Sequence, residues 1–275
     1  MKYKLICLDM DGTLLNSNKE VTPKTKEAIK EAREAGAHVA ICTGRPFVSA
    51  YQYAALLGIE APIISANGAF IKDAKSKAVI YKEILGKKRC KLILDVLLKY
   101  EIIPNFHTPE AIFTGGYNKH YMAYDKFNKT ADDDKKISIV ICEDWDRLFN
   151  EYENNIVKCI AIDDDIDKVR KAKKELLELE ELEVVSSYIN NFEIMKSGVS
   201  KGSGAKKMAE FLGLSADEVI CVGDNENDLS MIKYAGLGVC MENGEETVKK
   251  QADYITSSND EDGIAEVINK FILSK

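Results

Sequence analysis

"LICLDMDGTLLNS" (residues 5–17) is an apolar run of strand length that stops at two carboxylates, Asp9 and Asp11, and continues into a glycine. Taken alone, acids and a glycine after a strand are more often part of a turn than of a functional site. Two further apolar runs end in a similar way, at Thr43 in "AHVAICT" (37–43) and at Asp224 in "EVICVGD" (218–224). The fold that joins these strand ends therefore decides what the acids can do.

Strands alternate with helices towards both ends of the chain. In "TPKTKEAIKEAREAG" (22–36), Thr22 stands at the N-cap position, Pro23 falls in the first turn and Gly36 follows the last turn, as in a helix. Strands that are apolar throughout and separated by helices are typical of a parallel sheet covered on both faces. We predict an α/β fold with a doubly wound parallel sheet, with strands at 3–9, 37–43, 62–68, 218–224 and 237–241, and helices at 22–36, 46–58, 200–213, 226–236 and 244–253.

The middle of the chain has a different pattern. Longer helices are expected at 87–101 and 167–181, among short segments such as "AIFTG", "KISIVI" and "IVKCIAI". That mixture is typical of an α+β domain with an antiparallel sheet. We predict a core domain formed by residues 1–82 and 189–275, and an inserted α+β cap domain formed by residues 83–188.

The composition excludes several classes of protein. The 275 residues include 45 acidic and 38 basic side chains, for a formal charge of −7, so neither nucleic acid nor an anionic membrane surface is an expected partner. No window approaches the roughly 20 apolar residues of a membrane-spanning helix, and the first residues lack the pattern of a signal peptide. Seven cysteines without a CxxC pair indicate a reducing compartment. We expect a cytoplasmic protein.

The polar residues at the strand ends form a coherent set. In doubly wound sheets, ligands bind at the carboxyl ends of the strands. If the sheet is parallel, four acids, one hydroxyl and one cation meet at that edge: Asp9, Asp11, Thr43, Lys201, Asp224 and Asp228. By composition this is a site for a metal ion and a phosphate group.

The order of four motifs, "DMDGT", "TGR", "SKG" and "GDNEND", resembles that of the haloacid dehalogenase (HAD) superfamily of phosphohydrolases. The stretches "ISANGA" and "GDNENDLSMI" are similar to the Cof-like branch of that superfamily. The insertion between the second and third motifs resembles the larger C2-type cap, in its C2B form. The resemblance covers the whole α/β portion of the chain.

The resemblance implies a role for each acid. Asp9 would be the nucleophile that attacks phosphorus to give an aspartyl-phosphate, and Asp11 would protonate the leaving oxygen and later activate water. Mg²⁺ would be held by the Asp9 side chain, the Asp11 carbonyl and the Asp224 carboxylate, with Asp228 as a further ligand or a partner of one. A hard cation with carboxylate and carbonyl oxygens agrees with this assignment, because the phosphoryl charge must be screened before a carboxylate can attack.

The remaining motif residues would bind phosphate or substrate. Thr43 offers a hydroxyl to a phosphate oxygen, and Lys201 places a compact positive charge beside Asp9. Gly12 allows the backbone to approach the phosphate closely enough for its N–H to donate. Four further residues are candidate phosphate or substrate contacts, with turn formation or helix initiation as the alternatives: Gly44, Arg45, Asn67 and Asn227.

The histidines show no paired metal spacing. His38 falls in an expected strand, where a structural role is the default. His107 and His120 lie in the insertion, where a substrate contact is the less favoured alternative. Metal ligation by histidine is therefore not expected.

Together these residues predict a Mg²⁺-dependent phosphatase that hydrolyses a small phosphorylated metabolite, a sugar phosphate or a similar compound, through an aspartyl-phosphate. Two alternatives stay open. The same site could pass its phosphoryl group to a sugar hydroxyl, as a phosphomutase or phosphotransferase does. The chain could also be a phosphometabolite-binding protein without turnover, although a binder needs neither a nucleophile nor a separate acid. The sequence indicates neither the substrate nor the oligomeric state.

Overall fold

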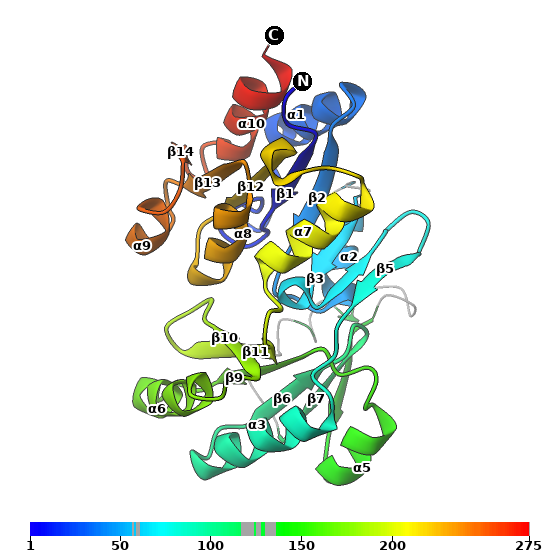
Figure 1. The fold of residues 1–275 in the computed structure, drawn as a ribbon, viewed down its shortest axis with the longest axis vertical. Coiled ribbons are helices and arrows are strands. Elements are labelled where there is room, and N and C mark those ends of the chain that lie inside the picture. Colours follow the sequence, from blue (N-terminus) through cyan, green and yellow to red (C-terminus); the bar gives the residue numbers. More distant parts are fainter. Residues whose placement is uncertain (57, 59–60, 117–123, 125–127, 130–135, 275) are drawn as a thin grey trace.

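The computed structural model describes residues 1–56, 58, 61–116, 124, 128–129 and 136–274, so His120 lies outside the described residues. Within them, two sheets form the framework (Figure 1). The larger, core sheet has eight strands in the order β14-β13-β12-β1-β2-β3-β4-β5. These strands are β1 (Leu5–Leu8), β2 (His38–Cys42), β3 (Ile63–Ser65), β4 (Phe70–Lys72), β5 (Val79–Lys82), β12 (Val219–Gly223), β13 (Leu237–Met241) and β14 (Tyr254–Thr256).

The core sheet is parallel from β14 to β3 and ends in two antiparallel strands, β4 and β5. Helices cover both of its faces, as predicted for a doubly wound fold. The helices of this half are α1 (Pro23–Glu34), α2 (Phe47–Leu56), α7 (Lys201–Phe211), α8 (Leu229–Tyr234), α9 (Glu246–Lys249) and α10 (Gly263–Ile268). The side chain of Thr22 caps α1 by accepting from the Thr25 N–H, as its position in the sequence suggests.

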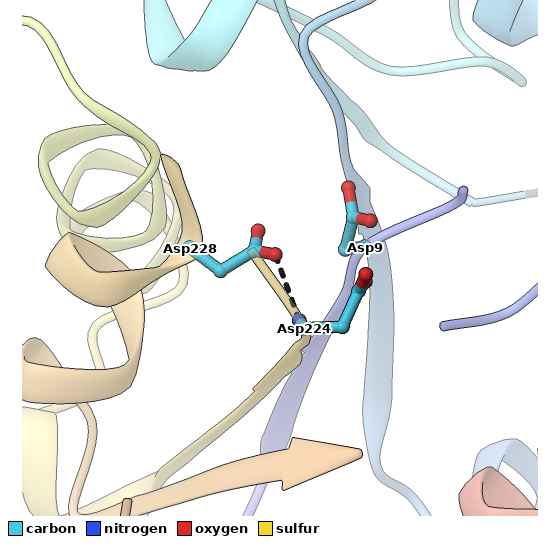
Figure 2. Close-up of side chains that lie close together, drawn as sticks. All are labelled: Asp9, Asp224 and Asp228. Carbon is cyan, nitrogen blue, oxygen red and sulfur yellow. Dashed lines mark hydrogen bonds between the residues drawn. The ribbon is translucent and has the colours of Figure 1, made fainter. Parts of the chain in front are cut away.

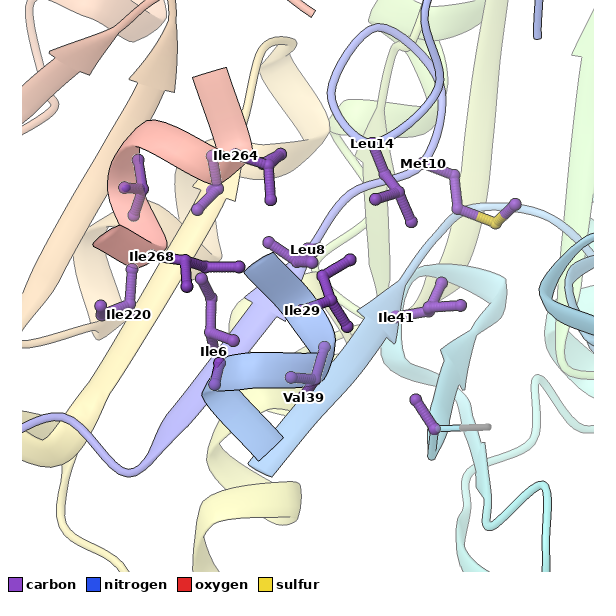
Figure 3. Packing of buried hydrophobic residues seen from close by; sticks show 14 of the residues in the cluster. Ile6, Leu8, Met10, Leu14, Ile29, Val39, Ile41, Ile220, Ile264 and Ile268 are labelled. Atoms are coloured by element: carbon purple, nitrogen blue, oxygen red, sulfur yellow. The ribbon is translucent and has the colours of Figure 1, made fainter. Parts of the chain in front are cut away.

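Alternate residues of each core strand face opposite sides of the sheet. Ile6 and Leu8 pack against α1 and α10, and Met10 continues that row beyond the strand (Figure 3). Leu5 and Cys7 face the other way, towards α7 and α8. Because both rows are fully buried, the short strand β1 is apolar at every position.

The register of the sheet brings the polar strand ends together. Leu8 pairs with Val222 of β12 on one side and with Ile41 of β2 on the other. The residues that follow these strands, among them Asp9, Thr43 and Asp224, therefore emerge at one edge of the sheet. These strand ends meet at one edge, as expected, and the functional roles of their residues stay predictions.

The second sheet belongs to the insertion and has six strands in the order β10-β11-β9-β6-β7-β8. They are β6 (Pro104–His107), β7 (Ala111–Thr114), β8 (Ser138–Ile141), β9 (Lys158–Ile162), β10 (Leu182–Val185) and β11 (Asn191–Lys196). All neighbours are antiparallel except β7 and β8. One face packs into a separate apolar cluster that includes residues of α3 (Lys87–Lys99), α5 (Trp145–Glu151) and α6 (Ile166–Leu177).

Several predicted boundaries are wrong. The cap sheet continues to Lys196, past the predicted boundary at residue 188, because β11 pairs with β9 and β10. The predicted strand 62–68 stops at Ser65, because Ala66 and Asn67 take φ of 49° and 53°, which a strand does not allow. The predicted helices 226–236 and 244–253 are shorter, at 229–234 and 246–249.

Gly68 holds the turn after β3 against α7. Its φ is +95°, and a Cβ there would lie 2.1 Å from the Ser200 carbonyl oxygen. Gly36 has nearly the same φ, +94°, but nothing lies within 4 Å of the Cβ position. Comparing Gly36 with Gly68 therefore separates the cost of placing a side chain at positive φ from the cost of its contact with α7.

We expect Gly68→Ala to lower the thermal midpoint more than Gly36→Ala. Gly36→Ala carries only the conformational penalty, about 1 kcal/mol or roughly 2–4 °C. Gly68→Ala adds an overpacking cost of about 1–3 kcal/mol, because backbone atoms must move. Thermal unfolding of the two variants tests this, and equal midpoints would contradict the close approach of α7.

Candidate active site

Three carboxylates meet where β1 and β12 end (Figure 2). Asp9 follows β1, Asp224 follows β12, and Asp228 ends a 3₁₀ turn that leads into α8. One ligand atom from each lies within 4.8 Å of the others, and the three residues are buried. The structure therefore brings together the acids expected from the sequence.

Lys201 lies between two of these acids. Its Nζ donates to Asp9 Oδ1 at 2.5 Å and to Asp228 Oδ1 at 2.6 Å. Lys201 is the first residue of α7, whose N-cap is Ser200 in a capping box with Ser203. The N-cap residue Ser200 fixes where α7 begins. The start of α7 in turn positions Lys201, which is 1% exposed.

The other oxygens of the cluster are also held. Asp228 Oδ2 accepts the backbone N–H groups of Asp224 and Asn225, at 2.9 and 3.0 Å. Asp224 Oδ1 accepts the Thr13 hydroxyl at 2.7 Å, and its Oδ2 accepts the Asn225 amide at 2.9 Å. Asp228 is thus bound by the Lys201 ammonium and by two backbone N–H groups, whereas Asp224 is bound by one hydroxyl and one amide, both neutral.

The charges of the cluster do not balance. Burial raises the pKa of Asp9 well above its ordinary value, the Lys201 charge opposes this in part, and Asp228 adds to it. Burial and the Asp228 charge raise the pKa of Asp224 to about 7. Against the cost of burial, Asp228 and Asp9 raise the pKa of Lys201 well above its ordinary value. Three carboxylates share one ammonium, so a hard divalent cation fits both the donor atoms and the missing charge.

The residues on either side of Asp11 help to separate it from Asp9. The intervening Met10 side chain is buried in the core cluster (Figure 3). Gly12 has φ +84°, and a Cβ there would lie 2.5 Å from Asp224 Oδ2. Only glycine fits this approach, so the backbone can turn immediately beside the acid cluster.

Asp11 is bound by two cations. Arg45 donates through Nε and Nη2 to its two oxygens at 2.7 and 2.8 Å, and Lys19 Nζ lies 3.0 Å away. Burial alone would raise the pKa of Asp11, but the bonds from Arg45 and the charge of Lys19 lower it to about 2. The predicted proton donor is therefore held as a carboxylate, and Arg45, expected on a substrate anion, is bound to Asp11.

Three further predicted site residues, Thr43, Asn67 and Asn227, lie on loops next to the acid cluster. Thr43 is buried and its hydroxyl accepts the Arg45 N–H at 3.2 Å. Asn67 donates to Glu193 Oε2 at 2.9 Å, and Asn227 donates to Asn67 Oδ1 at 3.4 Å. Glu193 belongs to the cap, so Asn67 connects the two sheets.

A pocket of about 440 Å³ joins the acid cluster to the cap. It is lined by seven of the predicted site residues: Asp9, Asp11, Thr43, Gly44, Arg45, Lys201 and Asn227. The other four, Gly12, Asn67, Asp224 and Asp228, contact this set. Their roles in phosphate and substrate binding stay predictions.

Sequence reasoning missed five residues around the pocket. Thr13 and Asn225 stand next to motif residues, so their hydroxyl and amide could have been included. Lys19, Lys158 and Glu193 had no local signal. Lys158 donates to Glu193 Oε2 and to the Gly44 carbonyl, and both cap residues are buried.

A sequence profile described as haloacid dehalogenase-like hydrolase matches residues 6–268. The chain belongs to this family. It is 32% identical over 285 residues to the Bacillus subtilis 5-amino-6-(5-phospho-D-ribitylamino)uracil phosphatase YwtE, covering 98% of both chains. It is 28% identical to the Escherichia coli pyridoxal phosphate phosphatase YbhA, covering 99% of this chain and 100% of that one.

A solved haloacid dehalogenase-like hydrolase from B. subtilis has the same fold, with a TM-score of 0.87 and 31% identity over 98% of this chain and 99% of that one. The predicted superfamily, its Cof-like branch and the assignment as a phosphatase are confirmed for this hydrolase. The C2B form of the cap stays a prediction. Among the described residues, no helix combines the length and apolar character needed to cross a membrane.

Arg45→Met tests the pair with Asp11. The pKa of Asp11 is lowered, so the Arg45–Asp11 pair stabilises the fold at pH values above about 3.9, which is the pKa of an Asp side chain in the unfolded protein. This stabilisation is lost as the pH falls through about 2, the pKa of Asp11 in the folded protein. We expect the variant to lose about 2 kcal/mol at pH 7, or roughly 4–8 °C. The difference from wild type should shrink as the pH is lowered from 5 towards 3.

Thermal unfolding without added metal, at pH 7, 5, 4 and 3, measures this difference. Arg147→Met is a matched control, because Arg147 is 80% exposed and lies 3.9 Å from its partner Glu151. That control should stay within about 0.5 kcal/mol of wild type. A difference for Arg45→Met that does not change with pH would contradict the ionised state of Asp11.

Proposed function

We propose that this hydrolase is a Mg²⁺-dependent phosphatase that cleaves small phosphorylated metabolites through an aspartyl-phosphate on Asp9. One observation carries the proposal. The Asp9 carboxylate lines the pocket, held by Lys201 and close to two further acids, with Asp11 separately held on the same loop.

The metal would be bound by the Asp9 and Asp224 carboxylates and the Asp11 carbonyl. Asp228, whose Oδ1 already binds the Lys201 ammonium and whose Oδ2 accepts two backbone N–H groups, would orient Lys201 and the loop rather than ligate directly. When bound, Mg²⁺ would screen the charge of the phosphoryl group against the carboxylates. Lys201 supplies a second positive charge at Asp9 from its fixed place at the start of α7.

The reaction then divides between Asp9 and Asp11. A bond forms between an Asp9 oxygen and phosphorus while the bond from phosphorus to the leaving oxygen breaks, and Asp11 gives that oxygen its proton. Water next attacks the aspartyl-phosphate, Asp11 takes up the proton, and free phosphate leaves with Asp9 restored. Arg45 must release Asp11 for the first step, because its hydrogen bonds favour the carboxylate form.

The names of the relatives support a small phosphomonoester as substrate. YwtE is named for a ribitylamino-uracil phosphate and YbhA for pyridoxal phosphate. Both are single small molecules, and a pocket of about 440 Å³ suits ligands of that size. The leaving group would lie against the cap residues that line the same pocket.

Asp9→Asn tests the nucleophile. We expect phosphate release from phenyl phosphate in Mg²⁺ to fall by at least about 10³-fold, because the amide is a poor nucleophile. Asp95→Asn is the control, since Asp95 is exposed on α3. Activity retained by Asp9→Asn would exclude the aspartyl-phosphate. With a sugar phosphate as the substrate of the wild-type protein, an isomerised product without free phosphate would identify a mutase instead.

Metal binding has a separate readout in calorimetric titration of the chelator-treated protein. Because Asp224 has a pKa of about 7, Mg²⁺ must compete with a proton there at lower pH. We expect affinity to rise from pH 6 to pH 8, by at most about tenfold per unit below 7. Asp224→Asn should abolish the heat of binding while Asp95→Asn keeps it, and binding retained by Asp224→Asn would remove Asp224 from the metal site.

A further inference from the structure

One outer strand of the cap sheet is apolar and exposed along its edge. In the described sheet, β8 has the sequence SIVI and pairs with β7 alone. Val140 and Ile141 are 41% and 60% exposed. Native edge strands are commonly protected by a charged side chain, a proline or a bulge, and β8 has none of these within the strand. An edge of this kind can pair with a further strand.

The hydrogen bonds around β8 show which backbone groups face outwards. The Cys142 N–H donates inwards, to the carbonyl of the last residue of β7, at 2.8 Å. Since alternate residues of a strand direct their backbone groups to the same side, Ile139 and Ile141 direct theirs to the outer edge. Ile137 does so too, and the Asn128 side chain binds both its N–H and its carbonyl, at 2.9 and 2.8 Å. No described residue binds the outward groups of Ile139 and Ile141 in this way.

The face of β8 that carries Val140 borders a groove of about 430 Å³, which α5 lines on its other side. The apolar lining comes from Phe113 and Val140 of the sheet, and from Leu148 and Tyr152 in α5 and at its end. A strand added at the outer edge of β8 would extend this face of the sheet and cover Val140.

The charges that flank β8 indicate that the added strand is β8 of a second copy. Lys136 precedes β8, Glu143 and Asp144 follow it, and all three are exposed. In an antiparallel pair of two β8 strands, the basic end of each lies beside the acidic ends of the other. The opposite edge strand of the cap, β10, lacks this match, because acids precede it at Glu180 and Glu181 and two serines follow it.

The outward backbone groups give the register of such a pair. Ile139 of each copy would exchange hydrogen bonds with Ile141 of the other, which brings the two Val140 side chains together at a two-fold axis. The same register sets Lys136 of one copy opposite Asp144 of the other. The edge of β8 therefore satisfies both its backbone groups and its flanking charges by pairing with itself.

We propose that this protein forms a symmetric dimer through antiparallel pairing of β8 with β8 of a second copy. The six strands of each cap sheet would then join into one continuous sheet. The paired strands are short, so the association is weak and depends on concentration. The inference is independent of the phosphatase function proposed above, because none of the residues assigned to this contact lines the active-site pocket.

Sedimentation velocity of the whole chain, from about 1 µM to about 1 mM protein, measures the association. We expect wild type to change from monomer to dimer over this range. Val140→Lys places two ammonium groups together at the axis, so the dissociation constant of the dimer should rise at least about tenfold. Val79→Lys is the control, because Val79 is 56% exposed on β5, an edge strand of the core sheet, and it should leave the constant unchanged.

Charge reversal tests the direction of the pairing. Lys136→Glu and Glu143→Lys should each raise the dissociation constant about 3- to 10-fold at low salt, and added salt should reduce the difference. Glu143→Lys would instead tighten a parallel pair, in which the acidic ends lie together. An equimolar mixture of the two variants should associate more tightly than either alone, because Lys136 of one still meets the acids of the other. Asp144 is left unchanged, since it caps α5.

A protein that stays monomeric throughout the concentration range would overturn the dimer. A dimer that Val140→Lys leaves unchanged would also overturn it, because another surface must then form the contact. If Val140→Lys does not fold, the two charge variants decide, since both positions are exposed and lie outside β8. Tighter association of Glu143→Lys, or a mixture no tighter than either variant alone, would contradict the antiparallel pairing of two copies.

Discussion

The structure depends on holding three carboxylates around one buried ammonium. Moving a charge out of water costs several kcal/mol, so Lys201 can be 1% exposed only if Asp9 and Asp228 are fixed against it. Those residues come from the end of β1, the start of α7 and the turn before α8. Parallel pairing of β1 with β12, the capping box of α7 and the backbone bonds to Asp228 each remove freedom from one of them. These contacts keep the charges paired, because unpaired charges would be too costly to bury.

The same constraint explains how two acids in "DMD" acquire opposite properties. Asp9 lies among other acids in a buried cluster, which favours its protonated form. Asp11 lies between Arg45 and Lys19, which favour its ionised form. The residue between them directs the two side chains apart, because Met10 is anchored in the core. Environment, rather than residue type, therefore sets the protonation of each carboxylate in the structure. The proposed reaction needs the reverse: bound Mg²⁺ would favour ionised Asp9, and release by Arg45 would let Asp11 hold a proton.

The core half of the site could be predicted because its signals are local. Apolar strands, their polar end residues and a helix start at Lys201 lie within short stretches of sequence, and a parallel sheet gathers them at one edge. The turn after β3 could not be predicted, because "SANG" reads equally as a strand end and the positive φ values of Ala66 and Asn67 depend on the packing of Gly68 against α7. The predicted boundaries of α8 and α9 were wrong for the same reason, because packing decides where these short helices end.

The residues of the cap sheet that line the pocket could not be predicted from the sequence, for a different reason. Lys158 is the one charged residue of β9, and Glu193 stands between apolar residues in β11. They meet only because β9 and β11 are neighbours. β11 itself was assigned to the core, so its inward face had no predicted partner. Alternation along a strand gives the cap sheet two independent faces. One face builds the apolar cluster of the cap and the other lines the pocket, so the polar groups in the pocket can differ without disturbing that cluster.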